Sequence, residues 1–349
     1  MAEPAAVQAS TNGGSPPVLE VRGLSKQFPI GGFFGRKQLH ALEDAWFSLH
    51  RGAITALVGE SGSGKSTAAR LVARLLPPTS GEILYAGIDV LQSESRQASR
   101  TYRSKVQMVF QDPFGSLNPV HTVGYHLERP LRIHDKAGRG DEVRERIDEL
   151  LQTVGLTPPR DFREKYPHEL SGGQRQRVSF ARALAVEPAI LLADEPISML
   201  DVSIRMGILN LMARLKDERG IAMLYITHDI ASARYVSDET IVMYAGRMVE
   251  GGRTDAVIQG AAHPYTQLLL SAVPNPKAGP STYAGGRSGL PSLIDPPDRC
   301  PFAARCPRVM EICERQMPER SQVTPDHWVR CHLNTTANGP AASVSSERR

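Results

Sequence analysis

The sequence predicts an α/β fold organised around a parallel sheet and a phosphate-binding loop. Residues 54–58 form a short apolar run, which is typical of a buried strand. The residues that follow, 59–67, match the phosphate-binding pattern G-x-x-x-x-G-K-[ST]. Apolar side chains then recur at helical spacing at Ala68, Leu71, Val72 and Leu75. A strand, a glycine-rich turn and a helix in this order predict a socket for phosphate, because backbone N–H groups and the helix N-terminus point into it.

The length and composition of the chain bound its possible functions. It has 349 residues, 41% of them hydrophobic, which suffices for one large domain or two modest ones. Its net charge of +4 makes no strong case for nucleic acid as a partner. Residues 1–17 lack the basic start and the apolar segment of a signal peptide, and no apolar run is long enough to cross a bilayer. We therefore expect a cytoplasmic protein that is peripheral to the membrane if another subunit holds it there.

The segments on either side of the phosphate-binding loop also predict strands. These strands are expected at residues 18–29, 45–49 and 82–85. The first has mixed polarity, which predicts an edge strand, and Phe28 lies near its end. A glycine-rich loop at residues 31–36 separates it from the second. Two prolines, Pro77 and Pro78, are expected to end the helix that follows the phosphate-binding loop, because proline cannot continue a helix.

The remainder of this domain alternates apolar runs with helical patterns. The runs that predict strands cover residues 106–110, 189–193, 221–226, 240–244 and 247–249. The run at 189–193 is apolar on both faces, as a central parallel strand is. Residues 120–165 are rich in charge and in helix formers and predict a small helical insertion. Ser171 is a predicted helix N-cap, and later helices are expected at 207–219 and 266–273.

Polar residues follow three of the predicted strands. Gln111, the pair Asp194 and Glu195, and His228 stand directly after these runs or one residue beyond. Because parallel strands end at one edge of a sheet, we expect them near the phosphate-binding loop. Asp194 is predicted to hold Mg²⁺, and Glu195 to accept a proton from an attacking water. Gln111 is predicted to contact the metal or the water, and His228 the γ-phosphate or the water.

Two surfaces of the chain are suited to phosphate. In the first, Lys65 is expected to reach the β- and γ-phosphates and Ser66 to ligate Mg²⁺. The nucleotide-contacting residues predicted there are Gly59, Glu60, Ser61, Gly62, Ser63, Gly64, Lys65, Ser66 and Thr67. The second is a helix N-terminus with the predicted contacts Ser171, Gly172, Gly173 and Gln174. One ATP site with two such surfaces predicts a dimer in which ATP lies between Lys65 of one chain and Ser171 of another.

These motifs, in this order, resemble those of the ATP-binding subunits of ABC transporters over residues 18–252. The matching features are the Walker A loop 59–67, Gln111 of the Q-loop, the signature 170–174, the Walker B residues Asp194 and Glu195, the D-loop 198–201 and the switch His228. The resemblance implies a P-loop NTPase of the ABC ATPase type, with an N-terminal antiparallel β part and a helical subdomain at about residues 112–175. It also implies that Phe28 stacks on adenine and that Asp201 contributes to the nucleotide site. Met199 departs from the pattern, because a small residue is usual there.

Further segments resemble the peptide-importing group of this family. They are residues 28–30, 60–64, 111–119, 166–170 and 263–266, and the Cys-Pro pairs at 300–301 and 306–307. The resemblance implies a dipeptide or oligopeptide importer with two transmembrane permease subunits, a sister ATPase subunit in a heterodimer, and an extracytoplasmic substrate-binding protein. Nickel, glutathione and sugar-derived substrates are alternative cargoes. A soluble ABC-type ATPase and a regulatory subunit with weak turnover are alternative functions.

The end of the chain is expected to form a separate cysteine region. The predicted divisions are a disordered tail at 1–17, the ATPase domain at 18–252, a linker and helix at 253–297, the cysteine region at 298–333 and a disordered tail at 334–349. All cysteines fall late, at Cys300, Cys306, Cys313 and Cys331, without the close pairs of common zinc sites. Four thiolates suit zinc or a [4Fe–4S] cluster, and the family resemblance favours the cluster. Four unligated thiols in a small apolar core are the alternative.

Overall fold

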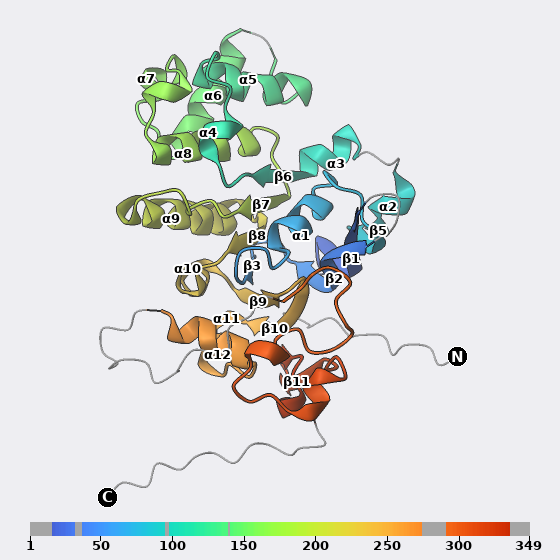
Figure 1. Ribbon diagram of the computed structural model, residues 1–349. Coiled ribbons are helices and arrows are strands. Elements are labelled where there is room, and N and C mark those ends of the chain that lie inside the picture. Colours follow the sequence, from blue (N-terminus) through green and yellow to red (C-terminus); the bar gives the residue numbers. More distant parts are fainter. Residues whose placement is uncertain (1–15, 32–36, 95–97, 139, 274–290, 336–349) are drawn as a thin grey trace, which may run out of the picture.

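The protein, in the computed structural model, consists of two sheets with helices packed around them (Figure 1). The structure describes residues 16–31, 37–94, 98–138, 140–273 and 291–335. The tails predicted at 1–17 and 334–349 lie almost wholly outside these ranges, as do most of the glycine-rich loop at 31–36 and most of the linker after residue 273. Within the described residues the predicted α/β class is confirmed.

The main sheet carries the strands that the apolar runs predicted. In the described part of the chain it has eight strands, in the order β11-β12-β10-β9-β3-β8-β7-β6. Between residues 54 and 253 its strands are β3 (Ile54–Val58), β6 (Val106–Val109), β7 (Ile190–Asp194), β8 (Ala222–Thr227), β9 (Glu239–Tyr244) and β10 (Arg247–Arg253). Strands β9, β3, β8, β7 and β6 pair in parallel. Every residue of β3, β7 and β8 is buried, which explains their unbroken apolar runs.

The second sheet is antiparallel and is formed by the N-terminal part of the chain. Its strands in the described residues are β1 (Leu19–Ile30), β2 (Lys37–Leu49), β4 (Ser80–Tyr85) and β5 (Ile88–Asp89), in the order β2-β1-β4-β5. The prediction that the first strand is an edge strand is wrong, because β1 lies between β2 and β4. Its mixed polarity has another cause: Leu19, Val21 and Leu24 pack into a core, while the residues between them are only partly buried. Strand β2 also begins earlier than the predicted residue 45.

The first helix, α1 (Lys65–Val72), begins inside the phosphate-binding pattern and ends earlier than predicted. Its apolar residues Ala68, Leu71 and Val72 are fully buried. Leu75 lies beyond the helix and is 55% exposed, so its predicted place on the apolar face is wrong. The helix ends before the two prolines, because Arg74 has a φ of 53°, in the left-handed region that an α-helix of L-residues cannot contain.

A helical subdomain forms one end of the molecule, in green in Figure 1. Its elements are α4 (Pro113–Ser116), α5 (Val123–Ile133), α6 (Asp141–Thr153), α7 (Pro159–Arg163), the 3₁₀ helix η1 (Pro167–Glu169) and α8 (Gly172–Leu184). The insertion is therefore helical, as predicted. Helices α2 (Val90–Ser93) and α3 (Arg100–Lys105) precede β6, and α9 (Val202–Arg219), α10 (Ile230–Val236), α11 (Thr254–Gln259) and α12 (Pro264–Ser271) follow β7. No helix among the described residues is both long and apolar enough to span a membrane.

The cysteine region continues the main sheet. It contains β11 (Ser321–Thr324), β12 (His327–Val329) and the 3₁₀ helices η2 (Ala303–Arg305), η3 (Glu311–Glu314) and η4 (His332–Asn334). Strand β12 pairs antiparallel with β10, with Glu250 opposite Val329. This region, in red-orange in Figure 1, shares a core with β9 and α12, in which Phe302 is buried against Tyr244 and Tyr265.

Candidate functional site

The phosphate-binding loop connects β3 to α1, and two glycines show why its pattern is fixed. A Cβ on Gly59 would lie 2.2 Å from the carbonyl oxygen of Met243. Gly64 has a φ of +99°, and a Cβ there would lie 2.5 Å from the carbonyl oxygen of Ala41. The obstacles are main-chain atoms, which cannot rotate away as side chains can. Only glycine therefore allows the loop to pass this close to its neighbours.

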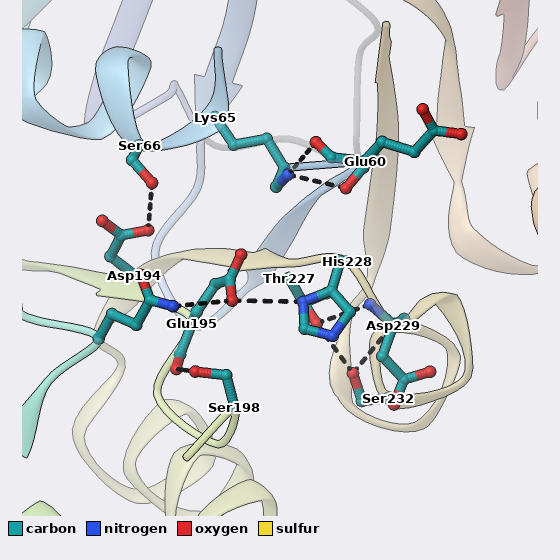
Figure 2. Close-up of polar contacts among 12 residues, drawn as sticks. Glu60, Lys65, Ser66, Asp194, Glu195, Ser198, Thr227, His228, Asp229 and Ser232 are labelled. Atoms are coloured by element: carbon teal, nitrogen blue, oxygen red, sulfur yellow. Dashed lines mark hydrogen bonds and ion pairs between the residues drawn. The ribbon is translucent and has the colours of Figure 1, made fainter. Parts of the chain in front are cut away.

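Lys65 closes the loop on itself. Its Nζ donates to the carbonyl oxygen of Glu60 at 2.8 Å (Figure 2). It also donates to the carbonyl oxygen of Gly59 at 2.7 Å and to Ser63 Oγ at 3.3 Å. The side chain is buried, and this burial lowers the pKa of Lys65, although the carboxylates of Glu195 and Asp194 act in the opposite direction. The ammonium group is thus held inside the loop by oxygen acceptors.

Two of the residues predicted to contact magnesium lie side by side. Ser66 Oγ donates to Asp194 Oδ1 at 2.8 Å, which joins the start of α1 to the end of β7 (Figure 2). Asp194 is 3% exposed, and burial raises its pKa, while the hydrogen bond from Ser66 lowers it. A hydroxyl and a carboxylate are oxygen donors of the kind that Mg²⁺ prefers. The pair fits the predicted metal by its chemistry.

The three predicted catalytic residues also meet at the ends of their strands. Gln111 Nε2 donates to Glu195 Oε2 at 3.3 Å, and the same oxygen lies 3.2 Å from His228 Nδ1. Glu195 has a φ of 45°, which is unusual for a residue other than glycine, and its N–H donates to Ile226 of β8 at 3.0 Å. Ser198 Oγ donates to the Glu195 carbonyl at 2.9 Å. Neighbouring groups thus hold Glu195 in a backbone conformation that aims its carboxylate at this edge.

The second phosphate-directed surface has the predicted helix cap. Ser171 Oγ accepts from the N–H of Gln174 at 3.3 Å, and Gln174 Oε1 accepts from the N–H of Ser171 at 3.0 Å. Gly173 is buried, and a Cβ there would lie 2.4 Å from Ile204 Cγ2. Among the described residues, no hydrogen bond or ion pair joins 171–174 to the phosphate-binding loop. The two surfaces are therefore not in direct polar contact within one chain.

Two further predicted residues lie away from this polar network. Phe28 is half-buried on β1, with Lys26 Nζ 4.9 Å from its ring centroid. Asp201 is exposed at the N-cap of α9, and its side chain forms no capping hydrogen bond. The predicted contacts of both residues with nucleotide stay predictions. Met199, the departure in the D-loop, is 54% exposed.

Two residues that contact the loop carry no signal in the sequence. Tyr265 OH accepts from the N–H of Glu60 at 2.9 Å. Arg305 donates from both terminal nitrogens to the Glu60 carboxylate, at 2.9 and 3.0 Å. They lie 205 and 245 positions from Glu60 in the chain, so no spacing pattern could have identified them.

The cysteines gather around one small cavity. All four thiols are free, buried and among its lining residues, with Phe302 and His332. Burial raises the pKa of Cys300 to about 12 and that of Cys331 to about 11. Backbone N–H groups two positions further along donate to Cys300, Cys306 and Cys331. Even so, among the described residues no group of three or more His, Cys, Asp or Glu side chains is arranged to hold a metal ion. The predicted cluster or zinc site therefore gains no support from a preformed ion site.

Comparison with known protein families gives two matches. Residues 42–198 match the family described as ABC transporter. Residues 249–313 match the family described as oligopeptide/dipeptide transporter, C-terminal region. The second match covers Cys300, Cys306 and Cys313 but ends before Cys331.

Known proteins agree with these matches. The chain is 43% identical over 322 residues to the oligopeptide transport ATP-binding protein AppF of Bacillus subtilis, which covers 90% of this chain and 97% of that protein. It is 41% identical over 318 residues to the dipeptide transport ATP-binding protein DppF of Haemophilus influenzae. That match covers 90% of this chain and 96% of DppF. The ATP-binding cassette MJ0796, solved as a dimer in a post-hydrolysis state with ADP and Pi, has a TM-score of 0.60 and 30% identity over 68% of this chain and 98% of that chain. The structure of cbiO1 from Clostridium perfringens, part of an ABC transporter complex, has a TM-score of 0.58 and 28% sequence identity. The match covers 73% of this chain and 99% of that chain. The chain therefore belongs to the ATP-binding proteins of ABC transporters, in the group that carries the oligopeptide/dipeptide transporter C-terminal region.

Proposed function

We propose that this chain binds and hydrolyses ATP to power an importer of dipeptides or oligopeptides. ATP chemistry follows from the family, and the peptide cargo is supported by relatives that are named as oligopeptide and dipeptide transport proteins. The observation that carries the proposal is the meeting of Ser66 with Asp194, and of Glu195 with Gln111 and His228, beside the phosphate-binding loop. No relative quoted above favours nickel, glutathione or a sugar-derived cargo, or a soluble ATPase.

The residues of the loop would bind the phosphates and their metal. Ser66 and Asp194 would hold Mg²⁺, which neutralises charge on the phosphates when bound. Lys65 would exchange its bonds to the loop carbonyls for bonds to phosphate oxygens, so the ammonium group would stay paired in both states. Backbone N–H groups from Gly62 to Thr67 and the N-terminus of α1 would complete the phosphate cradle.

Glu195 would act as the general base. Its Oε2 is held by Gln111 and His228, and among the described residues its Oε1 has no hydrogen-bond donor, which leaves that oxygen for a water. The carboxylate would take a proton from the water as the water oxygen bonds to the γ-phosphorus and the bond to ADP breaks. His228, whose side chain is 55% exposed, would orient the water or the γ-phosphate.

A second ATPase chain would supply the other half of each site. The capped N-terminus of α8, with Ser171 exposed, is suited to a phosphate bound on a partner. The separation of the two phosphate-directed surfaces within one chain supports this arrangement, and so does the dimeric structure of the ATP-binding cassette MJ0796. From the resemblance to peptide-importer ATPases we infer a heterodimer with a sister ATPase, in which Phe28 stacks on adenine and Asp201 lies at the dimer contact.

The helical subdomain would dock the transporter's membrane subunits. Large apolar side chains are exposed around α4 and α5, at Phe114 (51%), Val120 (68%) and Tyr125 (39%). We infer that this patch receives a short helix of a permease subunit, which would hold the chain at the cytoplasmic face of the membrane. An extracytoplasmic binding protein would deliver the peptide, and nucleic acid has no part in this function. Co-purification with the permeases, weakened by Phe114→Ser and Val120→Ser together, tests the docking surface.

The cysteine region, proposed at residues 298–333, would hold a [4Fe–4S] cluster, with zinc as the alternative. Four buried thiols around one cavity and the N–H donors to three of them support this inference, because such donors stabilise thiolates. Anaerobic purification followed by iron and sulfide analysis tests it. A colourless, metal-free and stably folded protein would show that the thiols are unligated.

The variant Glu195→Gln tests the proposed chemistry. It keeps the shape and the contacts of the side chain but cannot accept the proton, so we expect ATP turnover to fall by about 10²–10⁴-fold. ATP binding should persist, and an ATP-bound dimer should accumulate in size-exclusion chromatography. In a strain that lacks this chain, the parent should restore uptake of labelled peptides and the variant should not. Turnover at the parent rate in Glu195→Gln would rule out Glu195 as the base.

A further inference from the structure

Glu60, the second residue of the phosphate-binding loop, is held on three sides by described residues. Its carbonyl oxygen accepts from Lys65 Nζ at 2.8 Å (Figure 2) and also from the N–H of Ser63 at 3.2 Å. Its own N–H donates to Tyr265 OH at 2.9 Å, so this N–H points toward α12 and not into the loop. Its carboxylate receives both terminal nitrogens of Arg305, at 2.9 and 3.0 Å.

The outer two contacts come from the C-terminal part of the chain. Tyr265 lies on α12 and is fully buried. Arg305 ends the 3₁₀ helix η2, directly before Cys306, and its side chain is 19% exposed. Its guanidinium lies 5.7 Å from the ring centroid of Tyr244 and 5.8 Å from that of Phe302. The guanidinium thus lies among aromatic rings, and a planar fork that meets both oxygens of a carboxylate sets direction as well as distance.

The position of Glu60 matters to the loop because it forms the corner of a turn. The bond from the Ser63 N–H to the Glu60 carbonyl closes this turn, and the glycines with positive φ, Gly62 and Gly64, lie within it or just after it. If this corner is fixed before nucleotide binds, the phosphate-binding loop loses less conformational entropy on binding. Pre-organisation of this kind raises affinity without adding any contact to the ligand.

We propose that Arg305 is a positioning residue of the phosphate-binding loop, and that its fork onto Glu60 makes nucleotide affinity depend on the cysteine region. In this role Arg305 would affect the nucleotide through Glu60. Since Cys306 is the next residue, a change in the loop around Cys306 moves the guanidinium and thereby the corner of the phosphate-binding loop. The inference rests on nucleotide binding at this loop, as proposed above.

Isothermal calorimetry with MgADP and with a non-hydrolysable MgATP analogue tests the proposal on the full-length chain. We expect Arg305→Gln to weaken binding by about 5–10-fold, and Arg305→Lys to fall between it and the parent, because lysine keeps the charge but loses the fork. Glu60→Gln should match Arg305→Gln, and the double variant should bind no worse than either single one. The matched control is Arg315→Gln, which removes an exposed arginine of the same region that pairs with Glu311 and should bind as the parent does.

Hydrogen exchange distinguishes a positioning role from a merely structural one, because only a positioning role couples amide protection in the cysteine region to nucleotide binding. Coupling between two sites is reciprocal, so nucleotide should slow amide exchange at residues 300–306 in the parent and in Arg315→Gln. This nucleotide-dependent protection should disappear in Arg305→Gln and in Glu60→Gln. Should Arg305→Gln fail to fold, Glu60→Gln tests the same ion pair, because it replaces the carboxylate partner of Arg305 with a neutral side chain of the same shape.

The cysteine loop can be tested in the same framework. Cys306→Ser should weaken MgADP binding in the parent background and add nothing in the Arg305→Gln background, because both changes act through one contact. Additive effects would refute the link through Arg305. Binding by Arg305→Gln within twofold of the parent, with protection at residues 300–306 unchanged, would overturn the proposal as a whole. A parent chain that binds no nucleotide would refute the proposed function, and this inference with it.

Discussion

The buried pair of Glu250 and His327 attaches the cysteine region to the main sheet, and its removal should detach that region. Glu250 on β10 is 0% exposed and His327 on β12 is 1% exposed. Glu250 Oε1 lies 2.7 Å from His327 Nε2 and accepts from the N–H of Ala262 at 2.6 Å. Glu250 Oε2 accepts from the N–H of His263 at 3.1 Å. One carboxylate thus joins β10, β12 and the segment that leads into α12.

The expected loss of stability in Glu250→Ala follows from the polar groups that the substitution leaves without a partner. Glu250→Ala would leave the buried N–H of His263, the partly buried N–H of Ala262 and the imidazole of His327 without their acceptor. Each buried polar group that is left without its hydrogen-bond partner costs about 1–3 kcal/mol. We expect the free energy of unfolding of the C-terminal region to fall by about 3–5 kcal/mol in Glu250→Ala. Glu250→Gln keeps the shape and one acceptor oxygen, so we expect a fall of about 1–3 kcal/mol.

Urea denaturation combined with hydrogen exchange at residues 327–329 measures this loss. The matched control is Glu311→Ala, whose pair with Arg315 has side chains 76% and 74% exposed and should contribute less than about 0.5 kcal/mol. If Glu250→Ala stays within about 0.5 kcal/mol of the parent, the carboxylate does not hold the region in place, and the reasoning from its buried contacts is wrong.

Three other substitutions have definite expected outcomes. Lys65→Ala should lose at least about 100-fold in MgATP affinity by calorimetry, because the ammonium contacts with phosphate disappear; parent affinity would contradict its role. Gly59→Ala should bind no MgATP and melt at a lower temperature, since its Cβ would lie 2.2 Å from the Met243 carbonyl oxygen, whereas unchanged melting would show that the loop can move aside. Burial lowers the pKa of His263 to about 3, so the folded chain keeps its imidazole neutral, while the unfolded chain protonates it below the ordinary histidine pKa of 6.5. Stability should therefore fall as the pH falls from about 6.5 toward 3, by up to about 1.4 kcal/mol per pH unit, and His263→Asn, which can still accept from the Tyr265 N–H, should reduce this slope in urea titrations.

Several sequence-based predictions failed for reasons that lie in tertiary packing. The first strand was expected at an edge because its polarity is mixed, yet β1 has neighbours on both sides and only one covered face. Leu75 fits the helical spacing, but Arg74 turns the chain before it. Local patterns record which side chains are apolar, and they do not record which faces the rest of the fold covers.

The sequence alone was sufficient for the phosphate-binding loop and for the polar residues at the strand ends. These features depend on short-range backbone geometry: glycines where the chain passes close to itself, and polar residues where buried strands end at a common edge. Tertiary structure alone decided that β12 joins the main sheet, that Glu250 pairs with His327, and that Tyr265 and Arg305 hold Glu60. Pairs separated by 205 or 245 positions form only when the folded chain brings their elements together, so no local periodicity encodes them.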